Sequence, residues 1–365
     1  MNVHSLPAAA ATYGSADAWL RRPQDFVTGQ LERLRENRHA ISKNSAEEIL
    51  PTKRLEFMWP EEIQTNEDKN SLKISIDGAP PIAVSHHAFG QLCGLVPEAR
   101  TRFLRSLPAQ IAGPALEYGL HILAHTEEIK TYASPDLLRA ITSPTYGRVP
   151  DYQVVDAVQD SFAGRGWTVA EDYMAARASD KAMSIFLIDK ERPMTIGKDP
   201  NGDPDLLYRG IMFRNSEVGY TSLSVEAFLF RDYCCNGCIF GLADFERIRV
   251  VHSKRAPERW VHEVMPAIEH FAQSDGTTLM QAIERCRQNV VADDDKAAIA
   301  WLNRRGVSRK LADRVLALHE AEERRPARTL WDMAQGLSAA ARDLSFGDDR
   351  IEAEQEAGRL LALAA

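Results

Sequence analysis

Hydrophobic and polar residues alternate over residues 71–85, where the sequence reads SLKISIDGAPPIAVS. Apolar residues recur at positions 72, 74 and 76, which is the period of a strand with one buried face. The Asp77-Gly78 pair supplies a tight turn, and a second short strand follows two prolines. This stretch predicts a β-hairpin.

The hydrophobic period changes to that of helices after this hairpin. Ser85 is the expected N-cap of the segment HHAFGQLCGL, and EARTRFLRSL and PALEYGLHILAHTEE are predicted to form two further helices. Between residues 137 and 255 the pattern is mainly β, with a strand at LLRAITSP, a helix at DYQVVDAVQDSFAGRG and long β-branched and aromatic runs. From Pro257 onward, successive amphipathic segments with good caps predict helices.

This order of elements predicts an α+β protein, in which an antiparallel β-rich core with packed helices precedes an all-helical C-terminal domain. We expect a partly helical or flexible N-terminal arm over residues 1–65, where polar residues outweigh apolar ones. The α+β core domain is expected over residues 66–255 and the helical domain over residues 256–365. The sequence has no G-x-G-x-x-G after a strand and no Walker motif, which disfavours a dinucleotide- or NTP-dependent enzyme.

Three of the five cysteines lie in RDYCCNGCIFG, residues 231–241. Asn236-Gly237 is a strong signal for a two-residue hairpin turn, so we interpret Cys235-x-x-Cys238 as the two ends of that turn. A zinc site needs a second pair of Cys or His ligands, and none is evident in the sequence. A redox pair is a further alternative, although no βαβ context surrounds these cysteines.

The 365-residue chain carries 44 Lys+Arg against 52 Asp+Glu, a net charge of −8. A protein that holds DNA through an overall positive field is not acidic, so any nucleic-acid site must be a local cluster of cations with salt-sensitive binding. No apolar run approaches the roughly 18–20 residues of a membrane span, and the N-terminus lacks the pattern of a secretory signal. With an odd number of cysteines, these features predict a cytoplasmic protein without a disulfide framework.

Four segments occur in an order that resembles a known family. They are HHAFGQLCGLVPEARTRFLRSLPAQIAGPALEYGL, LLRAITSPTYGRVPDYQVVDAV, GIMFRNSEVGYTSLSVEAFLFRDYCCNGCIF and TLWDMAQGLSAAARDLSFGDDRIEAEQEAGRLL. Together, over about residues 80–360, they are similar to the phage/plasmid-like family of proteins, which is filed as a domain of unknown function. The resemblance implies an origin on a prophage, plasmid or integrative element, and it supplies no catalytic residue.

Aromatic and basic residues are interleaved in the β region, for example in TYGR, LYRG and FLFRD. Proteins that bind single-stranded nucleic acid combine stacking rings with cations along a sheet or groove. With the implied mobile-element origin, this predicts a DNA-handling protein that binds or anneals single-stranded DNA in replication or recombination, with a homo-oligomer as one expected form. The predicted nucleic-acid-binding residues are Arg139, Tyr146, Arg148, Tyr208, Arg209, Arg214, Arg231, Lys254 and Arg255. An ordinary sheet, with aromatic core residues and arginines that flank strands, explains the same pattern.

Residues 301–331 are the most basic helical stretch, with 8 basic residues against 4 acidic ones. The segment IAWLNRRGVSRKLADRVLALH predicts a helix, a break at Gly306, a cap at Ser308 and a second helix. This pattern is typical of a helix-turn-helix or helix-hairpin-helix that contacts the DNA backbone. Two solvated helix faces in a bundle explain it equally well.

Two other classes of function stay open. A metal-dependent nuclease or hydrolase is one, since KDPNGDPD at residues 198–205 resembles a loop of oxygen ligands, but turn chemistry explains the loop without a metal. His121 and His125 share a helix face without an evident third ligand, and no nucleophile elbow is present. The other class is a protein-interaction factor that counters host defence, which suits the net acidity. We predict no catalytic residues, no metal, no small-molecule cofactor and no membrane partner.

Overall fold

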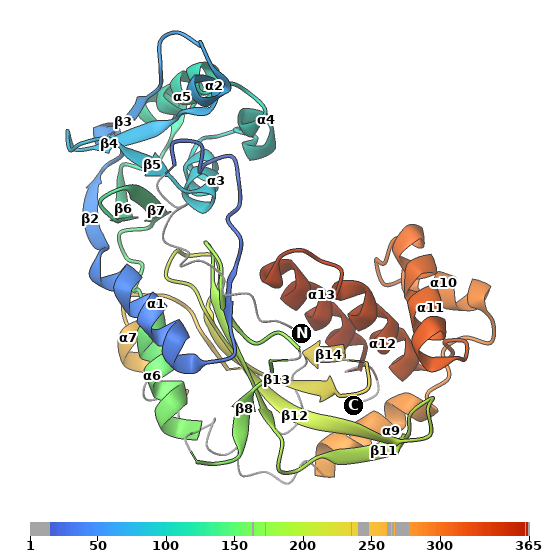
Figure 1. Cartoon of the computed structure of the whole chain (residues 1–365). Helices are drawn as coiled ribbons and strands as arrows, with labels where there is room; N and C mark the ends of the chain where they lie inside the picture. Colours follow the sequence, from blue (N-terminus) through green and yellow to red (C-terminus); the bar gives the residue numbers. More distant parts are fainter. Residues whose placement is uncertain are drawn as a thin grey trace.

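The computed structural model (Figure 1) describes residues 15–162, 164–171, 173–234, 236–239, 248–260, 264, 266, 277–361 and 363. Two β-sheets, several helices that pack on them and a group of helices near the C-terminus make up this part of the chain. The sheets are almost entirely antiparallel. The predicted α+β class, with a helical C-terminal region, is confirmed.

The smaller sheet has the strand order β2-β6-β7-β5-β4-β3. Its strands are β2 (Ala46–Pro51), β3 (Leu55–Met58), β4 (Lys73–Ile76), β5 (Ile82–Val84), β6 (Glu128–Ala133) and β7 (Leu137–Thr142). The predicted hairpin is confirmed, because Ile74 pairs with Ile82 and the turn residues Asp77 and Gly78 have φ angles of 50° and 75°. Of the described pairs, β5 with β7 is parallel and the others are antiparallel.

Short helices cover the smaller sheet. They are η1 (Thr52–Arg54), α2 (Asn66–Asn70), α3 (His86–Leu95), α4 (Thr101–Arg105), α5 (Ala109–Tyr118) and the π-helical turn η2 (Gly119–Leu123). The Ser85 hydroxyl accepts a hydrogen bond from the Ala88 N–H at 3.0 Å, which confirms the predicted N-cap of α3. Phe89, Leu92 and Leu116 are fully buried between these helices and the sheet.

The larger sheet has the strand order β1-β9-β10-β12-β13-β14, with β8, β11 and β15 paired beside this path. Its strands are β1 (Phe26–Thr28), β8 (Trp167–Val169), β9 (Ala176–Ala178), β10 (Met183–Asp189), β11 (Met194–Lys198), β12 (Pro204–Asn215), β13 (Leu223–Arg231), β14 (Asn236–Ile239) and β15 (Ile248–Val250). All of its described pairs are antiparallel. The long strands β12 and β13 form its centre.

Helices cover both faces of the larger sheet (Figure 1). On one face, α1 (Leu31–Lys43) and α6 (Asp151–Phe162) bury Leu34 and Val155 against Phe213 of β12. On the other face, Ile351 joins an aromatic cluster that includes Phe186 and Phe228. Both faces of β12 and β13 are therefore buried, which explains why these strands read as long apolar runs.

The C-terminal helices share a core with β11, β12 and β13 of the larger sheet, which contribute Ile196, Leu207 and Leu229. The helices are α9 (Thr277–Gln288), α10 (Asp295–Asn303), α11 (Arg309–Glu323), α12 (Leu330–Ala341) and α13 (Gly347–Leu361), and the short α7 (Ala256–Arg259) precedes them. Leu302, Val315 and Leu330 are fully buried between them. The Ser308 hydroxyl accepts from the Leu311 N–H, as the predicted cap requires. Across the described residues, no helix combines the length and the apolar character needed to cross a membrane.

Part of the predicted N-terminal arm belongs to both sheets. Within residues 15–65, β1 pairs with β9 of the larger sheet, while β2 and β3 are strands of the smaller sheet. The Trp19 side chain is fully buried in the core of the smaller sheet, and its indole N–H donates to the Asn70 carbonyl at 2.7 Å. This segment therefore links the two sheets.

The hairpin at the cysteines forms, but its turn lies earlier than predicted. Arg231 of β13 pairs with Asn236 of β14, and Phe230 pairs with Gly237. Asn236 and Gly237 are therefore strand residues, and the chain reverses direction between Arg231 and Asn236. Cys235 itself lies outside the described residues.

Candidate nucleic-acid interface

Three predicted residues, Arg139, Tyr146 and Arg148, lie close to one another around Tyr132. The Arg148 guanidinium carbon lies 3.8 Å from the centroid of the Tyr132 ring, and that of Arg139 lies 4.8 Å from it. Arg148 Nε donates to Glu47 at 2.6 Å, and the side chain of Arg139 pairs with Glu217 at 3.3 Å. Aromatic rings and carboxylates of the protein itself therefore hold both cations.

Tyr146 is also held by contacts within the protein, and two exposed cations follow its stacking partner in the chain. Its hydroxyl donates to the Ser216 carbonyl at 2.6 Å, and its ring stacks on His252 with centroids 5.0 Å apart. The chain then continues to Lys254 and Arg255, both of which are exposed. They are the two exposed residues among the nine predicted ones.

Three predicted arginines are buried, and this corrects their assignment. Arg209, Arg214 and Arg231 are 1%, 4% and 3% exposed. Their partners are Asp189 at 2.9 Å, Asp348 at 3.1 Å and Asp205 at 2.6 Å, respectively. A phosphate would have to displace a buried carboxylate to reach them, and an unpaired buried charge is strongly destabilising. These arginines therefore stabilise the sheet instead of presenting a phosphate site.

Tyr208 lies at the edge of the aromatic cluster on the larger sheet. It is half-buried, and its ring centroid lies 6.2 Å from that of Phe230. It lies six residues along β12 from Arg214, which is about 20 Å in a strand. The predicted residues therefore form no single continuous surface.

The NSEVG sequence at residues 215–219 runs from the last residue of β12 into the β12–β13 connection, and residues 215–218 are buried. The Asn215 amide donates to Asp151 at 2.7 Å, while Glu217 accepts from the Asp151 N–H at 2.9 Å. The Val218 carbonyl accepts from the Gln91 amide of α3 at 2.7 Å. These contacts join the larger sheet to α6 and α3, so the motif has a structural role at the junction of the sheets. Burial, together with the charge of Glu217, raises the pKa of Asp151 to about 7.

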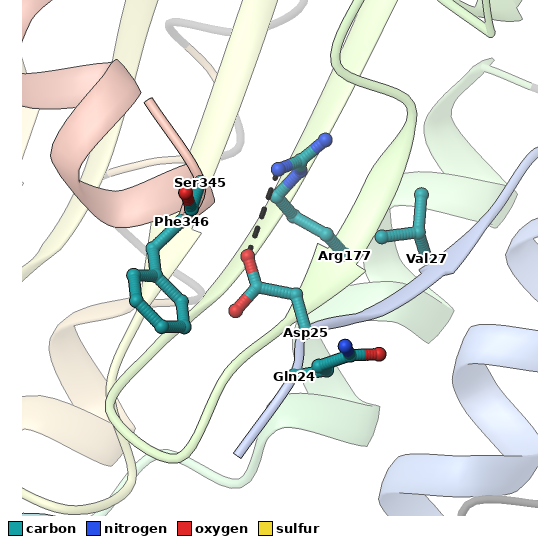
Figure 2. A pocket seen from close by; sticks show the side chains of 6 residues that line it. All are labelled: Gln24, Asp25, Val27, Arg177, Ser345 and Phe346. Atoms are coloured by element: carbon teal, nitrogen blue, oxygen red, sulfur yellow. Dashed lines mark ion pairs between the residues drawn. The ribbon is translucent and has the colours of Figure 1, made fainter. Parts of the chain in front are cut away.

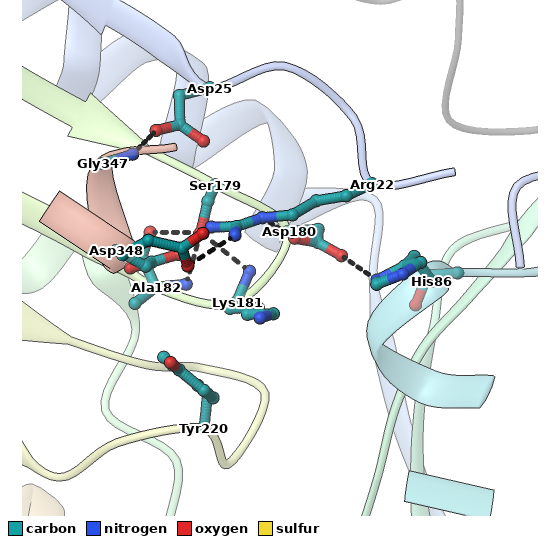
Figure 3. A network of polar contacts seen from close by, with 12 residues as sticks. Arg22, Asp25, His86, Ser179, Asp180, Lys181, Ala182, Tyr220, Gly347 and Asp348 are labelled. Atoms are coloured by element: carbon teal, nitrogen blue, oxygen red, sulfur yellow. Dashed lines mark hydrogen bonds and ion pairs between the residues drawn. The ribbon is translucent and has the colours of Figure 1, made fainter. Parts of the chain in front are cut away.

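A second polar network lies at the same junction, and Figure 3 shows Arg22 at its centre. Arg22 donates to Asp348 at 2.8 Å and to Asp349 at 3.0 Å, and it lies 3.8 Å from Asp180. Asp180 in turn lies 3.9 Å from His86 of α3. Burial raises the pKa of Asp180 to about 6 and lowers the pKa of His86 to about 4. The network ties the N-terminal segment to both α3 and α13.

A pocket of about 290 Å³ lies next to this network (Figure 2). It is lined by Gln24, Asp25, Val27, Arg177, Ser345 and Phe346. Asp25 pairs with Arg177 at 3.6 Å and accepts from the Gly347 N–H at 2.9 Å. The charges of this pocket therefore compensate each other, and we assign it no ligand.

The turn between α10 and α11 carries exposed cations that face solvent. Residues 303–312 contain four cations and no carboxylate. Arg304, Arg305, Arg309 and Lys310 are all exposed. Within the described part of the chain, Arg304, Arg309 and Lys310 form no ion pair, in contrast to the buried arginines of the sheet.

The shape of this turn concentrates the positive charge. Gly306 has a φ of +85°, which glycine adopts without strain, and Ser308 then begins α11. The Arg305 guanidinium stacks on Trp301 at 3.6 Å from the ring centroid. Its pKa is lowered by partial burial and by repulsion from Arg304. The first N–H groups of α11 add the positive end of the helix dipole to the same turn.

No metal centre forms in the described residues, where no group of three or more His, Cys, Asp and Glu side chains is placed to hold an ion. The Asp-rich loop is a turn, because Asp199 accepts from the N–H groups of Asn201 and Asp203 at 2.8 and 2.9 Å. His121 Nε2 contacts the Leu55 carbonyl at 3.0 Å. These contacts occupy polar atoms of the Asp-rich loop and of His121, the two places where the sequence left metal binding open.

A family model described as a domain of unknown function (DUF932) matches residues 140–345 of the chain. This span includes most of the larger sheet, the NSEVG connection and helices α9 to α12. No curated protein sequence and no solved structure matches the chain.

Proposed function

Since this chain belongs to the family that shares this domain of unknown function, we propose from its own residues that it handles DNA by binding the nucleic-acid backbone at the α10–α11 turn. The expected origin on a phage, plasmid or integrative element and the expected cytoplasmic location are parts of this proposal. The observation that carries it is the group of four exposed cations on residues 303–312, without a carboxylate among them.

Phosphate contacts account for sequence-independent binding to nucleic acid. At the α10–α11 turn, Arg304 and Arg309 flank Gly306, where the backbone is free of a side chain. Three unpaired cations lose no internal ion pair when they bind a phosphate. An acidic protein with a local basic turn is therefore expected to bind weakly and with strong salt dependence.

Lys254 and Arg255 stay in the proposal as a second contact, because they are the exposed pair among the residues predicted from sequence. The predicted preference for single strands has less support. Tyr146 is stacked on His252, and Tyr208 packs beside Phe230. With both rings engaged, the geometry favours contact with the backbone over base stacking, so no preference for single-stranded over duplex DNA is expected.

The test is fluorescence anisotropy of a labelled single strand and of a duplex with the same length, over a range of salt concentrations. The variant replaces Arg304, Arg309 and Lys310 with Gln. We expect at least a tenfold loss of affinity at low salt and a salt slope that is smaller by about 2–3, since each lost phosphate contact removes about 0.7–0.9.

The matched control removes three exposed cations elsewhere. Arg21, Arg54 and Arg359 have side chains that are 81%, 56% and 66% exposed, and each pairs with a nearby carboxylate. Their replacement with Gln changes the net charge by the same amount and is expected to leave the salt slope unchanged. An equal loss in both variants, or no binding by the parent chain at low salt, contradicts the proposal.

A further inference from the structure

A stripe of exposed apolar side chains runs along α5 and η2. Ile111, Tyr118 and Ile122 are 54%, 59% and 65% exposed, and Ala115 is exposed between them. Spacings of three and four residues place these side chains on one helix face. The opposite face carries Leu116, which is fully buried in the core of the smaller sheet. No described part of the chain covers the stripe, and contiguous exposed apolar residues mark interaction sites.

The stripe is complementary to itself when two copies pair in antiparallel orientation. Its four positions are symmetric about the point between residues 116 and 117, because they are spaced by four, three and four residues. Ile111 of one copy then lies opposite Ile122 of the other, and Ala115 lies opposite Tyr118. A small residue opposite a large ring allows two helices to approach closely.

The charges at the two ends of the stripe support the same orientation. Arg100 and Arg102 precede α5, Glu127 and Glu128 follow η2, and all four are exposed. None of them forms an ion pair within the described residues. Glu98, two residues before Arg100, is also exposed, and Lys53 of η1 is exposed near the acidic end, which leaves one net positive and one net negative charge at the two ends. In an antiparallel pair, the basic end of each copy lies near the acidic end of the other.

We propose that the α5–η2 stripe is the interface of a homodimer in which two copies pair antiparallel through Ile111, Ala115, Tyr118 and Ile122. A two-helix contact is at the small end of specific interfaces, so the dimer is expected to form reversibly in the micromolar range. The proposal does not rest on DNA binding, because α5 and the α10–α11 turn lie in separate parts of the molecule (Figure 1).

Sedimentation velocity of the full chain from about 1 to 100 μM tests the interface. We expect a concentration-dependent monomer–dimer equilibrium that Ile122→Glu weakens at least about tenfold, because it places a carboxylate opposite Ile111. The control is Val290→Glu, since Val290 is similarly exposed, at 60%, and follows α9 at the other end of the molecule. A chain that is monomeric throughout this range, or a dimer that Ile122→Glu leaves unchanged, overturns the proposal.

Disulfide formation tests the orientation. Copies with Ala115→Cys are mixed with copies that carry Tyr118→Cys, and the mixture is oxidised mildly beside each variant alone and the parent chain. We expect a covalent dimer in the mixture, because these two positions face each other, and little in the separate samples. Equal cross-linking of Ala115→Cys with itself contradicts the antiparallel arrangement.

Discussion

Several arginines of this protein are buried in ion pairs, so they add no positive charge to its surface. Arg209, Arg214 and Arg231 each face a buried aspartate, and such a carboxylate is tolerated inside a protein only with its partner. Other cations reach solvent, among them Arg304 and Arg309 on either side of the α10–α11 turn. An acidic chain thereby presents a locally basic surface on the helical region. Residue type alone did not distinguish these two groups of arginines.

Asp151 makes the stability depend on pH. Its pKa of about 7 in the folded protein lies above the value of about 3.9 for an exposed aspartate. The folded state therefore binds this proton more tightly, and the contribution to stability is lost as the pH rises through about 7. We expect Asp151→Asn to remove this loss, so that between pH 5 and pH 8 the parent loses on the order of 2 kcal/mol more of its free energy of unfolding than the variant does.

Urea denaturation at both pH values measures this difference. The comparison with Asp151→Asn is needed because other groups also titrate. The raised pKa of Asp180, about 6, acts in the same direction, while His86 and His87, with pKa values of about 4, lose stability as the pH falls. These contributions are common to both proteins and cancel in the difference. If the free energy of unfolding of the two proteins fell by the same amount between pH 5 and pH 8, the group that titrates would not be Asp151.

At the scale of elements, the sequence correctly predicted a turn, two caps and a helix break. The β4–β5 hairpin, the caps at Ser85 and Ser308 and the break at Gly306 follow from residues close together in the chain. Strand β2 was missed because Leu50 is its one buried residue, and a strand with so little burial shows no alternation. The ion pairs that bury the arginines of the sheet were also missed, because they join residues up to 134 positions apart.

Close packing between α11 and α12 depends on a glycine. A Cβ on Gly336 would lie 2.7 Å from the carbonyl oxygen of Val315. Gly336→Ala is therefore expected to separate the helices and to lower the free energy of unfolding by about 1–3 kcal/mol. Gly94 of α3 is the control, since a Cβ there meets nothing within 4 Å. Gly94→Ala is expected to stabilise by about 0.5–1 kcal/mol, measured by the same denaturation. Destabilisation by both variants would point to a general intolerance of alanine.

The whole molecule depends on contacts between segments far apart in the sequence. Residues 15–28 bury Trp19 in the smaller sheet, add β1 to the larger sheet and place Arg22 against α13. The NSEVG connection makes a second link, through Val218 and Gln91. Since both sheets share these links, we expect them to unfold in one cooperative transition.

Asp348 is the residue on which the first link depends most. It accepts from Arg22, Arg214 and Ser179 and is 3% exposed. Asp348→Ala leaves two buried guanidinium groups without this carboxylate, so we expect a loss of about 3–5 kcal/mol in the free energy of unfolding. The neighbouring Asp349 also pairs with Arg22, but its side chain is 46% exposed, so Asp349→Ala is expected to cost less than about 1 kcal/mol.

Guanidinium denaturation followed by both circular dichroism and tryptophan fluorescence measures the two losses. For the parent chain and Asp349→Ala we expect the two signals to coincide, because the sheets unfold together. For Asp348→Ala the weakened link is expected to separate them, since two of the six tryptophans, Trp19 and Trp59, pack in the core of the smaller sheet while the helices dominate the dichroism. Equal losses for the two variants would mean that Arg22 is held mainly from the exposed side, by Asp349, and that the buried network contributes little to the junction.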